Sequence, residues 1–132
     1  MQNARMYDSN LDYCVFFKAR AQESSWRRCR GESQNLREAE LGKATFDDCS
    51  LVRSDLGAVG ARQCRFQSCD LHGADLRFAD FLNGALRDCK LGSADLRWAS
   101  LFACDLLYAA VNEETNLESA NIERTRLALG GL

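Results

Sequence analysis

The sequence has no proline, a single histidine and no long apolar run. Because a membrane-spanning helix needs about 20 consecutive apolar residues, we expect no contact with a membrane. The polar start, residues 1–5, is not followed by the apolar core of a signal peptide. A cytoplasmic location is therefore expected, with secretion as an effector that lacks a conventional signal peptide as the alternative.

The composition is that of a globular domain. Of the 132 residues, 46% are hydrophobic and 27% are charged, which excludes a disordered chain. The formal net charge of −2 is far from the strong basic excess that nonspecific nucleic-acid binding requires. We therefore expect no direct binding of nucleic acid.

The sequence repeats with a period of five residues. Residues 74–78, for example, read as a small residue, Asp, Leu and two variable residues. The central apolar residue recurs at every fifth position from Met6 to Val111, which gives 22 centres without a change of register. One extra residue enters near 112–115, and the repeats resume over 115–129.

This period fits neither an α-helix nor a β-strand, whose apolar residues recur about every 3.6 and 2 residues. It requires a turn in each unit, and four turns close a coil of 20 residues. Coils stacked at the strand spacing of about 4.8 Å place each residue over the residue 20 positions later. All four columns of centres are apolar except at Gly31, and the inward position two residues before each centre is small except at Gln34 and Val59. We predict one all-β, four-sided parallel solenoid of about six coils over residues 1–132.

The repeated unit resembles that of the pentapeptide-repeat proteins, whose motif is Ala-Asp/Asn-Leu followed by two variable residues. The resemblance covers nearly the whole chain and is strongest from Cys64 to Leu107. It implies a right-handed quadrilateral parallel β-helix. Family members that protect DNA gyrase from quinolones resemble B-form DNA in size and charge and commonly dimerise through their C-terminal end. This chain departs from them in its balanced charge and in an unbroken repeat that leaves no room for loops.

All seven cysteines occupy the small inward position of their units, as expected for core filler. They are Cys14, Cys29, Cys49, Cys64, Cys69, Cys89 and Cys104. Four of them form one column with a spacing of 20 residues. Zinc needs four sulfurs within about 4.6 Å of one another, whereas the ends of this column are about 14 Å apart. We expect no metal, no disulfide and no cofactor, and reduced thiols favour the cytosol.

The outward positions hold the groups that catalysis would need, and none forms a catalytic set. His72 faces solvent while the cysteines face inward, so no Cys–His pair is expected. Asp55, Asp75 and Asp95 share one outward column, where an Asp can hydrogen-bond the backbone of its turn and nearby arginines offset its charge. The basic run 26–30 is interpreted as a solvated face. We therefore predict no enzyme and no catalytic residue.

One outward cluster is apolar, which favours a contact surface. Phe78 and Trp98 share an outward column, and Leu82 and Phe102 share the column on the adjoining side. The candidate interaction surface is Phe78, Leu82, Trp98, Phe102, Leu107 and Tyr108. An ordinary surface, or one covered by the C-terminal tail, remains the alternative.

These features together favour a non-enzymatic protein-binding module whose partner is a protein. We expect a homodimer joined through the C-terminal coils, and the resemblance adds a topoisomerase such as gyrase as a possible partner. The alternative is a structural stalk or domain of a secreted effector or of a larger assembly.

Overall fold

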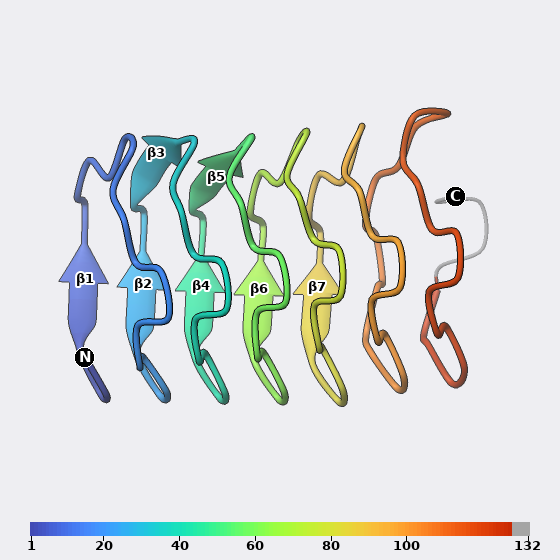
Figure 1. Ribbon diagram of the computed structural model, residues 1–132, viewed down its shortest axis with the longest axis horizontal. Helices are drawn as coiled ribbons and strands as arrows, with labels where there is room; N and C mark the ends of the chain where they lie inside the picture. Colours follow the sequence, from blue (N-terminus) through green and yellow to red (C-terminus); the bar gives the residue numbers. More distant parts are fainter. Residues whose placement is uncertain (128–132) are drawn as a thin grey trace.

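The computed structural model describes residues 1–127, which wind around one axis with successive coils side by side (Figure 1). Seven strands of three residues each lie on the coils. They are β1 (Arg5–Tyr7), β2 (Ser25–Arg27), β3 (Arg30–Glu32), β4 (Thr45–Asp47), β5 (Ser50–Val52), β6 (Arg65–Gln67) and β7 (Ala85–Arg87). Within this part of the chain there is no helix, and hence none that could cross a bilayer.

Every strand pairs in parallel with residues 20 positions away. One sheet has the order β1-β2-β4-β6-β7 and the other pairs β3 with β5. In the larger sheet Met6 lies beside Trp26, and Trp26 beside Phe46. This register confirms the predicted fold, a right-handed quadrilateral parallel β-helix. The strands span about four turns rather than the predicted six, because isolated bridges alone join the remaining coils.

The pairing interval changes near the C-terminal end. Lys90 pairs with Ala110, an interval of 20 residues, whereas Asp95 pairs with Asn116, an interval of 21. The additional residue is taken up in a loop that Asn112 organises, since its Oδ1 accepts hydrogen bonds from the backbone N–H groups of residues 93 and 114. Residues 128–132, the end of the predicted repeat frame, lie outside the described residues.

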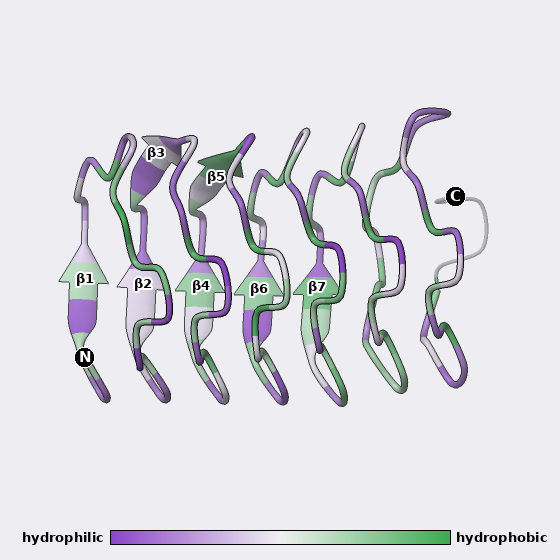
Figure 2. Ribbon diagram, in the orientation of Figure 1, coloured by the Kyte–Doolittle hydropathy of each residue, from purple (hydrophilic) through white to green (hydrophobic). Residues whose placement is uncertain are grey.

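The centres of the repeats form one continuous core. Figure 2 shows apolar residues at corresponding places on successive coils. On the side that carries β2, β4 and β6, the rings of Trp26, Phe46 and Phe66 stack with centroid distances of 5.0 and 4.4 Å. Phe81, on a neighbouring side, meets Phe66 edge-on at 5.9 Å. The predicted columns therefore do face a common interior.

The corners are formed by left-handed turns. The second residue after every centre from Met6 to Leu106, and after Leu117 and Ile122, has a positive φ, and with Asn3 this conformation occurs at 23 non-glycine positions and at Gly73. None of these residues is β-branched, as expected for a conformation that is most unfavourable for Val, Ile and Thr. In most turns the N–H of the third residue after the centre donates to the centre's carbonyl, as Ala79 does to Leu76 at 3.1 Å. A positive φ at the third turn residue together with this bond defines a type II turn.

The motif Asp or Asn completes these turns. Its Oδ1 accepts the backbone N–H two residues later, an N–H that the neighbouring coil does not bind. The residues that do so are Asn10, Asn35, Asp55, Asp70, Asp75, Asp80, Asp95, Asp105, Asn116 and Asn121. None of the seven strands begins with Asp or Asn. An Asp or Asn that binds its turn is thus not found at the start of a strand, although sides without it, such as those of Arg20 and Glu40, also form only isolated bridges.

Candidate functional site

Two exposed rings that contact each other form an apolar feature on the side of the solenoid. Phe78 and Trp98 stack face to face, with centroids 5.2 Å apart and planes 7° from parallel. They lie on successive coils, and the two residues are 55% and 48% exposed. The guanidinium of Arg97 lies over the Trp98 ring at 5.6 Å. The pair is therefore a rigid apolar surface with a cationic group at its margin.

The structure gathers four of the six predicted surface residues. Leu82 and Phe102 are half-buried on the next side, and Arg124 lies over the Phe102 ring at 5.5 Å. We call Phe78, Leu82, Trp98 and Phe102 the aromatic edge. Tyr108, which is 60% exposed, follows Trp98 by ten residues, which is half a coil, so it lies at the opposite corner. Leu107, also half-buried, lies on the side between that corner and the aromatic edge.

A second group of exposed apolar residues lies on the first coil and was missed by the sequence analysis. Tyr13, Val15 and Phe17 are 70%, 72% and 47% exposed. Val15 occupies the place at which Asn35 and Asp55 bind the turn backbone on the next two coils. The absence of Asp or Asn at position 15 was therefore the sequence signal for this exposed group. It was missed because Val15 lies among other apolar residues.

The C-terminal end of the described solenoid is also apolar. Leu117, Ile122 and Leu127 are the centres of the last coil, yet they are 40%, 51% and 44% exposed. Together with Val111 and the leucines of the preceding coil they line a small recess of about 60 Å³. The repeat therefore places core-type side chains at an end that the described residues leave open.

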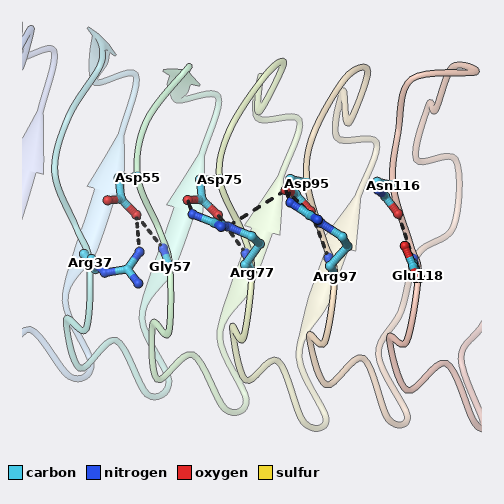
Figure 3. A network of polar contacts seen from close by, with 9 residues as sticks. All are labelled: Arg37, Asp55, Gly57, Asp75, Arg77, Asp95, Arg97, Asn116 and Glu118. Carbon is cyan, nitrogen blue, oxygen red and sulfur yellow. Dashed lines mark hydrogen bonds and ion pairs between the residues drawn. The ribbon is translucent and has the colours of Figure 1, made fainter.

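The Asp column beside the aromatic edge is a structural ladder (Figure 3). Arg77 pairs with Asp75 at 2.8 Å and Arg97 with Asp95 at 2.7 Å. Hydrogen bonds from these guanidinium groups hold the pKa of both carboxyls below the usual value. Each Asp also binds its own turn backbone. The carboxylates are thus engaged in the fold and are not paired with one another as an acid–base couple.

The cysteines are buried except for Cys14, and all seven are free thiols. The turns after β2, β4, β6 and β7 lack the usual turn hydrogen bond, and their corner residue is a cysteine whose thiol donates to a backbone carbonyl. These residues are Cys29, Cys49, Cys69 and Cys89. Ser9 does the same after β1. The thiols therefore act as hydrogen-bond donors as well as filler, which composition alone does not reveal.

The remaining candidate groups form no reactive site. His72 is exposed, and its backbone N–H donates to Asp70. Trp26 is 2% exposed, so the basic run around it offers no aromatic surface for a base. Within residues 1–127, no three His, Cys, Asp or Glu side chains are grouped so as to hold a metal ion.

Residues 49–92 match the family described as pentapeptide repeats, in eight copies. A comparison with curated protein sequences finds no significant match. Among solved structures, the pentapeptide repeat protein Rfr23 from the cyanobacterium Cyanothece 51142 superposes with a TM-score of 0.71 at 15% identity, covering 97% of this chain and 86% of that one.

Two further solved structures show the same fold. A trypsin-treated variant of QnrB1, a plasmid-mediated fluoroquinolone resistance protein, gives a TM-score of 0.61 at 16% identity over 97% of this chain and 85% of QnrB1. A pentapeptide repeat protein from the thylakoid lumen of Arabidopsis thaliana gives 0.69 at 13% identity, with 73% and 67% covered. Identities this low show a shared fold and do not assign a partner.

Proposed function

We propose that this chain, a pentapeptide-repeat β-helix, is a non-enzymatic protein-binding module that uses the aromatic edge as its contact surface. The observation that carries the proposal is the stacked, half-exposed pair Phe78 and Trp98. Large aromatic side chains fixed before binding lose little conformational entropy on contact, and they frequently dominate binding energy.

The backbone of the two rings supports a role in binding. Phe78 and Trp98 have φ values of 61° and 58°, a conformation that Gly or Asn adopts at lower cost. The same turn position carries Ala58 one coil earlier and Ser119 one coil later, so the fold does not need a ring there. The turn therefore does not dictate two large rings at this place, which agrees with a use of their exposed faces.

The partner that we propose first is a second copy of the chain, joined near residues 98–132. The open apolar end formed by Leu117, Ile122 and Leu127 lies next to the coil that carries Trp98 and Phe102. A two-fold axis at this end would bury both apolar surfaces against their own copies. Residues 128–132 of this segment lie outside the described residues.

Light scattering combined with circular dichroism tests this proposal. The wild type should be a dimer at micromolar concentration, and the double variant Trp98→Glu, Phe102→Glu should be a folded monomer. The matched control is Tyr13→Glu, which changes an exposed ring on the first coil, at the other end of the solenoid from residues 98–132, and should remain dimeric. A wild-type monomer, or a control that dissociates as readily as the double variant, would contradict dimerisation through these coils.

A topoisomerase is the second candidate partner, supported by the fold similarity to QnrB1, a fluoroquinolone resistance protein. Gyrase supercoiling assayed with and without a quinolone measures this directly. Protection that is lost in Trp98→Glu would support it, whereas no effect of the wild type would favour the structural stalk or assembly domain.

A further inference from the structure

Asn83 and Gly84 form the one Asn-Gly pair in the sequence, and they lie at the corner that precedes β7. Asparagine is a thermolabile residue, because the next backbone nitrogen can attack its side-chain carbonyl carbon. A following glycine leaves that nitrogen least shielded, since glycine has no Cβ. The other asparagines precede Ala, Leu, Glu or Ile. The sequence therefore concentrates this reactivity at one corner.

The structure separates the two groups that would react. Asn83 is exposed, whereas Gly84 is buried and its N–H donates to the carbonyl oxygen of Phe81 at 2.8 Å. The nitrogen can attack only after it gives up this bond, loses its proton and turns toward the Asn83 side chain. Further bonds hold the corner closed, because the N–H of Asn83 donates to the next coil at 3.1 Å and the N–H of Ala85 donates to the preceding coil at 2.9 Å.

We propose that Asn83 is a conditional deamidation site, inert while this corner is closed and reactive when the surrounding coils open. In the open chain the Gly84 nitrogen loses its proton to water and bonds to Cγ of Asn83, and the Cγ–Nδ2 bond breaks as ammonia leaves. Water then opens the cyclic imide at one of its two carbonyl carbons. Opening at Cγ gives aspartate, whereas opening at the main-chain carbonyl gives isoaspartate, in which the main chain runs through Cβ and Cγ.

The two products have different consequences for the fold. Aspartate fits the corner, because three other units carry it at the same turn position with a positive φ, at Asp8, Asp48 and Asp88. Isoaspartate lengthens the main chain by one carbon between the bond of Asn83 to the next coil and the bond of Ala85 to the preceding coil. A chain that is longer at this point cannot keep both bonds, so a molecule that has stayed open long enough to react does not return to the native stack. The site shares no residue with the aromatic edge and stands independently of the proposed function.

Peptide mapping by mass spectrometry tests the site, on reduced protein kept at mildly alkaline pH either folded or in guanidinium chloride. A synthetic peptide of residues 79–88 gives the rate without structure. In denaturant Asn83 should deamidate at the rate of the peptide, while the asparagines that precede Leu or Ile stay intact over the same interval. The folded protein should react at least about tenfold more slowly, a factor that corresponds to about 1.4 kcal/mol of opening free energy. Equal rates in the folded protein and the peptide would overturn the proposal.

Removal of the denaturant tests the consequence for the fold. Size-exclusion chromatography separates refolded from misfolded chains, and electron-transfer fragmentation distinguishes isoaspartate from aspartate. We expect isoaspartate at position 83 only in the chains that fail to refold, and aspartate at position 83 among the refolded ones. An equal share of isoaspartate in both fractions would show that the longer main chain is tolerated and that the proposal is wrong.

Two variants provide matched controls. Asn83→Asp has the charge of the product without a longer main chain, so it should refold like the wild type by circular dichroism. Its failure to refold would assign the loss to the charge and contradict the role of the main chain. Gly84→Ala should lower the deamidation rate in denaturant, where the fold has no influence, and the same column carries Ala44. An unchanged rate would show that the nitrogen of residue 84 is not the attacking group.

Discussion

Gly31 and Gln34 are the two residues of the second coil that break the repeat, and the structure shows that they complement each other. Gly31 is a centre without a side chain, and Gln34 is a large residue at a small inward position. A Cβ at position 31 would collide with the Gln34 amide and lie 2.9 Å from the carbonyl carbon of Leu11. Gln34 is 1% exposed and its Nε2 donates to the carbonyl of Ser50 at 3.3 Å. The amide therefore fills the space of the missing centre.

This exchange predicts a non-additive pair of substitutions. Gly31→Leu alone should destabilise by about 1–3 kcal/mol because it overpacks the core. Gln34→Ala alone should destabilise by leaving a cavity. The double variant should recover at least about 1 kcal/mol relative to the sum of the single losses, as measured by urea denaturation. Simple additivity would show that the two residues are independent exceptions.

Asp75 illustrates the two functions of the motif carboxylate, which substitution can separate. Asp75→Asn keeps the bond to the turn backbone, as Asn35 shows, and loses only the half-exposed ion pair with Arg77. We expect a loss of about 0.2–1 kcal/mol. Asp75→Ala also leaves the N–H of Arg77 without its acceptor and should cost about 1 kcal/mol more.

The ion pairs of Asp75 and Asp95 also predict a pH dependence. Because the pKa of both carboxyls is lowered in the folded state, their stabilisation is present above the unfolded pKa and is lost as pH falls through the folded pKa. The wild type should therefore lose stability below about pH 4 more steeply than the double variant Asp75→Asn, Asp95→Asn. Equal slopes of unfolding free energy against pH would contradict this.

The loop at Asn112 makes a prediction at the level of the element. If Glu113 is deleted, residue 114 takes the left-handed position, Thr115 the inward position and Asn116 the motif position of a regular unit. The deletion should change stability by less than about 1 kcal/mol, because it restores a turn that the other coils already use. Deletion of Ala58, in the unbroken repeat, should prevent folding by shifting every later column. Circular dichroism and thermal denaturation of both variants distinguish these outcomes.

The sequence predicted which residues share a column, because a strict period of five admits one stacking. It did not predict which sides become strands, since Asp or Asn at the position before the centre excludes a strand, as at Asp75, but its absence permits either a strand, as at Arg65, or an isolated bridge, as at Glu40. It grouped Tyr108 with Trp98 by proximity in sequence, whereas half a coil separates them in space. The donor role of the Cys69 thiol was likewise invisible, because it requires a carbonyl from another coil.

The rates at which the free thiols are alkylated measure how the whole molecule unfolds. Burial raises the pKa of Cys104 to about 12 and also raises the pKa of Cys64 and Cys29. Few of these thiols are therefore ionised at pH 8, and they are shielded as well. Under native conditions Cys14 should alkylate first, and the other six at rates that follow unfolding. Mass spectrometry of partially alkylated protein measures the order, and rapid modification of Cys64 would show that the central coils open locally.

The left-handed corner in every unit has a consequence for how the chain folds. An isolated coil would hold four residues in a conformation that costs about 1–2 kcal/mol each, without the bonds that neighbouring coils exchange. Such a coil cannot persist, so the smallest stable nucleus contains at least two adjacent coils formed together. The stacked rings of Phe46 and Phe66, with centroids 4.4 Å apart, place a close aromatic contact between coils near the middle of the sequence. Folding is then expected to begin there and to advance one coil at a time toward both ends.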